Sequence, residues 1–263
     1  MSVPAFRFAP SPNGELHLGH AYSALLNARM AAEADGRFLI RIEDIDTIRC
    51  TPALIAAALL DLAWLSLSWE KPVRIQSRHV SDHHAQQARL GGMGLLYPCF
   101  CTRRDIALRG DPARSDPDGQ PLYPGTCRAL SQAEIERRIA AGESPALRLD
   151  MAAATSDSAA LAWGDVVLVR KDIGTSYHMA VVTDDHLQAI TDVVRGRDLE
   201  AATPIHRTLQ RLLGFTSPRY RHHILIGDET GQKLSKSEGA KSLRALRQEG
   251  ITAKDIRRGL GFA

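Results

Sequence analysis

The sequence predicts an α/β protein whose core is a doubly wound parallel sheet interrupted by an insertion. Two apolar segments, 6–8 and 38–42, flank a stretch over 18–34 with helix-forming composition, which indicates a β-α-β unit. Continuous apolar strands joined by a helical crossover are typical of a parallel sheet with both faces covered. Between residues 97 and 160 the pattern gives way to Cys, Pro, Gly and Asp, so we expect an insertion there.

The remaining elements follow from hydrophobic periodicity and from the Gly and Pro residues that interrupt it. The expected helices span residues 52–65, 81–91, 131–141 and 176–184, followed by two short helices within 243–262. The expected strands span residues 165–170, 188–194 and 223–226. Ligands of a parallel sheet bind beyond the carboxyl ends of its strands, which places residues 9–11 and 43–46 around one crevice.

Composition limits the class of protein. With 263 residues, 44% of them hydrophobic, the chain can bury a sizeable core. Its net charge of +3 permits a nucleic-acid partner without demanding one. The sequence has no long apolar run and no charged-then-apolar leader, so we expect a cytoplasmic protein that neither is secreted nor spans a membrane. We also expect a monomer.

A His-Leu-Gly-His sequence at residues 17–20 marks the start of the first expected helix. A helix N-terminus leaves backbone N–H groups unpaired and carries a partial positive charge, so it binds phosphate readily. His17 and His20 lie on one face of the first turn, where both can donate hydrogen bonds to phosphate oxygens. Gly19 lets a flat nucleotide approach the backbone. Taken alone, two surface histidines at a helix start are the preferred explanation of the pattern, because short motifs often match by accident.

Two lysines, Lys233 and Lys236, lie in the Gly-rich polar segment 227–239 that follows the last expected strand. Such a composition is typical of a mobile loop. Lysines on a loop of this kind can close over a triphosphate and neutralise charge as pyrophosphate leaves, although a solvated basic loop is the alternative when the segment is taken alone. Together with the His pair, they indicate an ATP site that forms adenylates, with Mg²⁺ bound to the ATP.

Three of the four cysteines, Cys99, Cys101 and Cys127, fall within the insertion. Thiolates suit tetrahedral zinc, so their spacing predicts a structural zinc ion that folds an otherwise core-poor segment. Three thiols without a metal are the alternative. The fourth ligand has to come from elsewhere, and the residues nearby leave five candidates: Tyr123, Asp105, Asp111, Asp116 and Asp118.

Taken together, these motifs resemble the glutamyl-tRNA synthetase branch of the class I aminoacyl-tRNA synthetases, which implies a Rossmann-type catalytic domain. The residues that carry the resemblance extend over nearly the whole chain: 7–20, 41–44, 76–78, Tyr177, 195–199 and 233–237. Full-length members carry a large C-terminal anticodon-binding region, for which no room remains here. A short form with the Cys-x-Cys and Tyr-x-x-x-Cys pattern attaches glutamate to the queuosine base in the anticodon of tRNA(Asp), so we expect ATP, L-glutamate and that tRNA as partners.

The resemblance implies a role for each matching residue. Six residues would bind glutamate: Arg7, Ala9, Ser11, Glu43, Tyr177 and Arg195. Among them, Arg7 would pair with the side-chain carboxylate, because a guanidinium fork suits a carboxylate, and Glu43 would hold the ammonium. Ordinary ion pairing and core packing are the alternatives for these side chains.

The same resemblance assigns the nucleotide and metal sites. ATP would be bound by His17, Gly19, His20 and Lys236, and the catalytic groups would be His17, His20, Lys233 and Lys236. The zinc ligands would be Cys99, Cys101, Tyr123 and Cys127. The polar stretch between Cys101 and Tyr123 is longer than the short form leads us to expect, but long polar loops are tolerated at little energetic expense.

We therefore expect four parts. They are the first half of the nucleotide-binding catalytic domain (1–96), a zinc-bearing insertion similar to an acceptor-binding region (97–160), the second half of the catalytic domain with the lysine loop (161–240), and a short helical tail without an anticodon-binding domain (241–263). Three other functions stay open: a truncated synthetase that charges the 3′ end of tRNA(Glu), a small-molecule adenylyltransferase, and a non-enzymatic RNA-binding paralogue.

Overall fold

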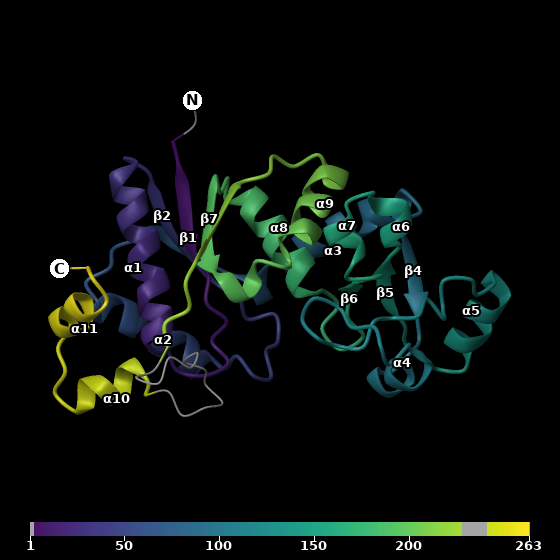
Figure 1. Cartoon of the computed structure of the whole chain (residues 1–263), viewed down its shortest axis with the longest axis horizontal. Helices are drawn as coiled ribbons and strands as arrows, with labels where there is room; N and C mark the ends of the chain where they lie inside the picture. Colours follow the sequence, from purple (N-terminus) through teal and green to yellow (C-terminus); the bar gives the residue numbers. More distant parts are fainter. Residues whose placement is uncertain (1–2, 228–240, 263) are drawn as a thin grey trace. The chain divides into compact units, whose positions relative to one another are not determined.

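The structure is a computed structural model that describes residues 3–227 and 241–262 (Figure 1). Lys233 and Lys236 lie outside the described residues. The chain divides into two units. The first comprises Met1–Arg78, Leu187–Glu200 and Pro218–Ala263, and the second comprises His79–His186 and Ala201–Ser217.

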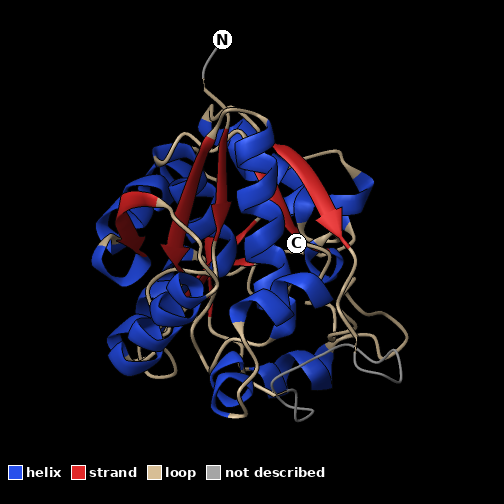
Figure 2. Cartoon of the chain, turned by 90° about the vertical axis from the view of Figure 1, so that its left-hand side faces the viewer, coloured by secondary structure: helices blue, strands red, loops and turns tan. Residues whose placement is uncertain are grey.

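The first unit carries a five-stranded sheet of order β3-β2-β1-β7-β8. Its strands are β1 (Ala5–Phe8), β2 (Arg37–Ile42), β3 (Glu70–Ile75), β7 (Asp192–Gly196) and β8 (Arg219–His223). Every neighbouring pair is parallel, which confirms the predicted fold class. Helices lie against these strands in Figure 2, as the burial of all four residues of β1 requires.

Four helices of this unit cover the sheet or follow it. They are α1 (Leu18–Glu33), α2 (Pro52–Trp64), α10 (Leu243–Gln248) and α11 (Ala253–Gly259). Helix α1 connects β1 to β2 and contacts β1, β2 and β7, which confirms the β-α-β unit. The two short tail helices are also confirmed, and they belong to the same core because Leu243, Ile256 and Phe262 pack into it.

Two strands of the first unit differ from the prediction. The strand expected at 188–194 begins only at Asp192, because Ala189 takes a left-handed backbone (φ 52°) that interrupts an extended run. The strand expected at 223–226 is instead β8 at Arg219–His223, and Ile224, which follows it, is 58% exposed. Because β8 is an edge strand, polar residues can form it, and the apolar residues after it were a misleading signal.

The second unit contains a three-stranded sheet of order β4-β5-β6 whose pairs are antiparallel. Its strands are β4 (Leu96–Cys99), β5 (Ala146–Leu149) and β6 (Val167–Val169). The segment 165–170 was expected to resume the nucleotide-binding fold, but β6 pairs with β5 through Leu147 and Val169. The sequence of so short a strand does not indicate which sheet the strand joins. Only the observed pairing with β5 shows it.

Seven α-helices are described in the second unit. They are α3 (Val80–Gly92), α4 (Arg103–Arg109), α5 (Gln132–Ala140), α6 (Met151–Ala154), α7 (Ser158–Leu161), α8 (Tyr177–Leu187) and α9 (Thr203–Leu213). The helices expected at 81–91, 131–141 and 176–184 are confirmed as α3, α5 and α8. A separate core holds this unit together, including Leu90, Leu149, Met179 and Leu209. The proposed functional division of the chain, with an insertion at 97–160, stays a prediction.

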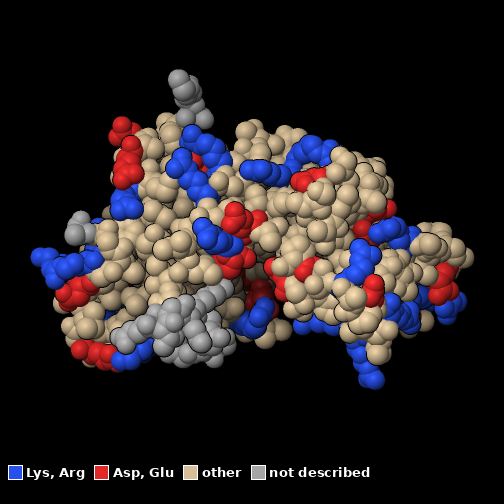
Figure 3. Space-filling model, viewed as in Figure 1, with Lys and Arg blue, Asp and Glu red and all other residues tan. Residues whose placement is uncertain are grey.

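Surface charge and helix composition add two further observations. On the face shown in Figure 3, basic and acidic side chains are interspersed, in keeping with the small net charge of +3. Among the described residues, no helix combines the length and the apolar character needed to cross a bilayer.

Candidate active site and metal centre

The two histidines of the His-Leu-Gly-His sequence cap helix α1. His17 Nδ1 accepts a hydrogen bond from the Gly19 N–H (3.1 Å), and His20 Nδ1 accepts one from the His17 N–H (3.2 Å). A ring nitrogen that accepts carries no proton, so the proton of each neutral imidazole resides on Nε2. Capping therefore orients both rings, whose centroids lie 3.9 Å apart, and makes Nε2 the donor nitrogen of each neutral ring.

Packing also requires a glycine at position 19, in addition to the access to the backbone that the sequence led us to expect. A Cβ atom at this position would lie 3.0 Å from Cε1 and 3.2 Å from Nδ1 of the His17 ring. Real Cβ atoms rarely approach other atoms so closely, so a larger residue would push the His17 imidazole out of its capping position. The geometry of the helix start therefore depends on the glycine between the two histidines.

The chain that follows the lysine segment returns to this helix start. The Leu243 N–H donates to the Leu16 carbonyl (2.7 Å), and Ser242 forms an antiparallel bridge with His17. An ion pair between Arg244 and Glu15 (3.3 Å) adds to this contact. Residues 242–244 therefore contact the segment that leads into α1.

The carboxyl ends of β1 and β2 lie side by side, because the two strands form a parallel pair. Strand order reverses between β1 and β7, and ligands of open parallel sheets bind at such a switch point. Arg7 is buried within β1, whereas Ser11 beyond the strand end is exposed, with its Oγ 3.8 Å from Cys50 Sγ. The Glu43 N–H donates to the Pro10 carbonyl (3.0 Å), which ties the two strand ends together.

Glu43 is held by a residue to which the sequence analysis gave no role. Arg41 is fully buried, and its Nη2 lies 2.9 Å from Glu43 Oε1. An arginine inside the apolar strand over 38–42 was the available signal, because a buried guanidinium requires a carboxylate partner. The neighbouring Asp44 is also buried and accepts from the N–H (2.9 Å) and Oγ (2.6 Å) of Ser77, at the start of the 3₁₀ turn Gln76–Arg78.

Arg195 on β7 is a third buried arginine near the switch point, after Arg7 and Arg41. Its Nη2 donates to the Leu199 carbonyl (2.9 Å), and its Nε lies 3.4 Å from His222 Nε2. The register that pairs Phe6 with Asp192, when continued, puts Arg195 level with Ala9. The first unit therefore brings Arg7, Ala9, Ser11, Glu43 and Arg195 to one region of the sheet.

Tyr177 belongs to the second unit, where it begins α8 and its ring contacts His178 and His206 edge-on.

The three cysteines of the insertion converge. Their sulfur atoms all lie within 4.8 Å of one another, and Cys101 Sγ is 3.6 Å from Cys127 Sγ. Tetrahedral zinc with Zn–S bonds of about 2.3 Å holds its sulfurs about 3.8 Å apart, so the cluster fits a zinc ion. Tyr123 is buried in the same cluster, and its hydroxyl accepts from the Cys127 N–H (2.8 Å).

Three of the four aspartates that were alternatives to Tyr123 make hydrogen bonds elsewhere. Asp105 caps helix α4 through Thr102, whereas Asp111 and Asp116 accept backbone N–H groups within their own turns. Asp118 makes contacts of its own. The described geometry thus brings Tyr123 into the cysteine cluster, whereas Asp105 lines the neighbouring cavity without joining the group of potential metal ligands.

Arg148 supplies positive charge to this cluster. Its guanidinium carbon lies 3.9 Å from the centre of the Tyr123 ring. Burial by itself raises the pKa of the Cys99 thiol, but hydrogen bonds from Tyr123 and Arg148 outweigh it and lower the pKa overall. Burial and the neighbouring Cys127 raise the pKa of Cys101 to about 12. A thiolate is the form that binds a metal, so the arrangement favours at least one ready ligand.

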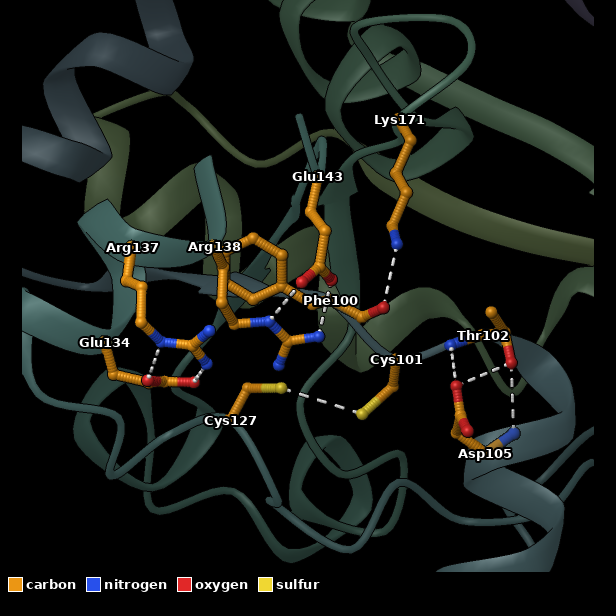
Figure 4. Close-up of polar contacts among 10 residues, drawn as sticks. All are labelled: Phe100, Cys101, Thr102, Asp105, Cys127, Glu134, Arg137, Arg138, Glu143 and Lys171. Carbon is orange, nitrogen blue, oxygen red and sulfur yellow. Dashed lines mark hydrogen bonds and ion pairs between the residues drawn. The ribbon is translucent and has the colours of Figure 1, made fainter. Parts of the chain in front are cut away.

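A cavity of about 210 Å³ borders two of the cysteines, Cys101 and Cys127. Figure 4 shows that Arg138 lies over the Phe100 ring while it pairs with Glu143, and that Lys171 donates to the Phe100 carbonyl. These contacts hold the chain between the first two cysteines in place.

Comparison with known proteins extends over nearly the whole chain. The family model described as tRNA synthetases class I (E and Q), catalytic domain, matches residues 5–261. The chain is 44% identical to a glutamyl-Q tRNA(Asp) synthetase of Rhodobacter capsulatus, over 97% of this chain and 99% of that protein. It is 39% identical to a protein of the same name from Nitratidesulfovibrio vulgaris, over 95% of this chain and 83% of that protein.

A solved structure of a related ligase has the same fold as this chain. The crystal structure of a glutamate tRNA ligase from Elizabethkingia meningosepticum, in complex with its amino acid, matches with a TM-score of 0.74 at 25% identity. The match covers 95% of this chain and 54% of the ligase, so the chain spans about half the length of that relative.

Proposed function

Because this chain belongs to the catalytic-domain family of the class I tRNA synthetases for glutamate and glutamine, which are ligases, we propose that it activates L-glutamate with ATP and transfers the glutamyl group to the queuosine base in the anticodon of tRNA(Asp). The observation that carries this proposal is the similarity, over at least 95% of this chain, to relatives named glutamyl-Q tRNA(Asp) synthetase. A tRNA substrate would be met in the cytoplasm, as expected from the sequence.

The first step joins glutamate to the nucleotide. A carboxylate oxygen of glutamate attacks the α-phosphorus of ATP in line, the bond to pyrophosphate breaks, and glutamyl-adenylate forms. The protein contributes mainly position and charge, because the reaction brings two anions together. His17 and His20 would donate Nε2–H bonds to phosphate oxygens, supported by the N-terminus of α1. Lys233 and Lys236 would neutralise the departing pyrophosphate, and Mg²⁺ bound with ATP would share its charge.

The glutamate pocket matches the charges of its substrate. Glutamate carries two carboxylates and one ammonium. The buried Arg7 and Arg195 would meet the two carboxylates, and Glu43, which pairs with the buried Arg41, would meet the ammonium. Arg7 would bind the side-chain carboxylate, which favours glutamate over glutamine because an amide offers no charge to the guanidinium. Ala9 and Ser11 would complete the part of the pocket on the first unit, and the role of Tyr177 stays a prediction.

The second step transfers the glutamyl group to RNA. A nucleophile on the queuosine base attacks the activated carbonyl carbon, the bond from that carbon to the AMP oxygen breaks, and AMP leaves. In the second unit, Cys99, Cys101, Tyr123 and Cys127 would hold a structural zinc ion, which cross-links the end of β4 to the loop at 123–127. Arg148 would balance part of the negative charge of these ligands.

The test is transfer of labelled glutamate to purified tRNA(Asp), prepared with and without queuosine, in the presence of ATP. Label that appears only on the queuosine form, and that survives periodate treatment of the 3′ end, supports the proposal. Label on tRNA(Glu) that periodate treatment blocks would instead identify a minimal synthetase that charges a 3′ end. The absence of label from both tRNAs would favour the adenylyltransferase or RNA-binding alternatives.

A further inference from the structure

Arg41 connects Glu43 to a residue far away in the sequence. Both Nε (3.3 Å) and Nη2 (2.9 Å) of Arg41 donate to Glu43 Oε1, while Nη1 donates to the side-chain oxygen of Gln188 (3.2 Å). Gln188 lies in the connection between α8 and β7, beside the left-handed Ala189. The guanidinium of Arg41 is thus held from two sides by groups on separate segments of the first unit.

Because Arg41 and Glu43 are buried, they depend on hydrogen bonds within the protein. The side chain of Arg41 is fully buried and that of Glu43 is 10% exposed, so water contributes little to their solvation. A buried guanidinium that loses an acceptor is destabilised, and it shifts toward its other partners. Because Nε and Nη2 of Arg41 both donate to Oε1 of Glu43, a rotation of the guanidinium displaces that oxygen.

We propose that Gln188 is a positioning residue for glutamate binding, which acts through Arg41 to hold the Glu43 carboxylate where the substrate ammonium arrives. This inference rests on the proposed function, since it uses the role of Glu43 in the glutamate pocket. A carboxylate has about four acceptor positions, so the two bonds from Arg41 orient Glu43 and still permit it to bind an ammonium. Gln188 itself touches no substrate.

Gln188 is the residue of this hydrogen-bonded group that can be substituted without disrupting the fold. Replacement of Arg41 would remove two hydrogen bonds from the largely buried Glu43 carboxylate and should destabilise the fold, whereas Gln188 is half-buried in a connection. Gln188→Met keeps the length of the side chain and removes the acceptor. Gln188→Glu keeps both length and acceptor, so it serves as the conservative rescue. Gln248→Met, at an exposed residue of α10, is the matched control.

The experiment measures steady-state glutamyl transfer to queuosine-containing tRNA(Asp), with KM for glutamate and for ATP. In Gln188→Met we expect KM for glutamate to rise about 3- to 10-fold, since one hydrogen bond to a charged group is lost indirectly, while KM for ATP stays the same. Gln188→Glu and Gln248→Met should remain within about twofold of the wild type. Inhibition by glutarate, which is glutamate without its amino group, should be equally strong in all four proteins.

Glutarate separates positioning from a general structural effect. If Gln188→Met weakened glutarate and glutamate equally, the pocket as a whole would be distorted and the inference would be wrong. An unchanged KM for glutamate in Gln188→Met, or a failure of Gln188→Glu to restore it, would equally overturn the inference while the proposed function stood. If the wild-type protein transferred no glutamate, the proposed function would fail first and this inference with it.

Discussion

Replacing His20 separates the two contributions that its ring makes at the start of α1. Nδ1 accepts the hydrogen bond from the His17 N–H at 3.2 Å, which caps the helix, and the Nε2–H group would reach the phosphates of ATP. His20→Ala removes both contributions. His20→Asn keeps an acceptor close to the position of Nδ1 and lacks the outer donor, whereas His20→Gln keeps a donor near Nε2 and lacks the capping acceptor.

The expected magnitudes differ enough to be told apart. The His20 bond is one of two side-chain cap bonds at this helix start, and losing a cap interaction costs about 1 kcal/mol. In a protein of this size that lowers the Tm by about 2–4 °C. Loss of one preorganised donor to the reacting phosphates lowers kcat by about 10²- to 10³-fold. His20→Ala should show both losses, His20→Asn mainly the second and His20→Gln mainly the first.

The assay combines thermal unfolding with kcat and KM for glutamyl transfer to queuosine-containing tRNA(Asp). We expect the Tm of His20→Asn to stay within about 1 °C of the wild type while kcat falls at least about 100-fold. A His20→Asn protein with nearly normal kcat would refute the reasoning, because it would mean that His20 only caps the helix. Equal losses of Tm in the Asn and Ala variants would refute the capping role.

Three further predictions concern other parts of the chain. Lys236→Ala should lower kcat about 100-fold and leave KM for glutamate nearly unchanged; a raised KM with normal kcat would contradict its role at the pyrophosphate. Cys127→Ser should reduce bound zinc below one ion per chain and lower the Tm by about 5 °C or more, measured by metal analysis and thermal unfolding; wild-type protein purified without zinc would contradict the site. Burial raises the pKa of Asp61 more than the partly exposed Arg247 lowers it, so the folded state binds this proton more tightly than the unfolded state does. The free energy of unfolding should therefore fall in the wild type, relative to Asp61→Asn, as the pH rises from about 4 to 6; urea titrations at both pH values check the sign.

Local signals explain why much of the fold could be predicted. Helix α2 begins where Thr51 accepts from the Leu54 N–H and Pro52 provides the first residue, and both features are visible in the sequence. The His pair is local in the same sense, since its capping bonds join residues at most three apart. Backbone capping and hydrophobic periodicity act within a few residues, so they can be inferred without knowledge of the tertiary structure.

Strand pairing and burial could not be predicted in the same way. The sheet that β6 joins and the edge position of β8 depend on which strands lie alongside them. Arg41 is another case, because its partner Gln188 is 147 residues away. Each of these features is a long-range contact, and many pairings are compatible with the same short apolar or polar segment.

The sequence by itself determined the fold class, the β-α-β unit, the helix start at His17 and His20, and the set of residue types that suits zinc. The family resemblance pointed to Tyr123, and the tertiary structure placed it with the three cysteines. Only the tertiary structure decided that Arg148 brings its charge to them and that Gln188 and Glu43 share one buried guanidinium. The difference has a physical reason. Helix starts and periodic faces are stabilised by neighbours along the chain, whereas a buried charge or a metal ligand is selected by whatever the packed fold places within about 3–4 Å of it.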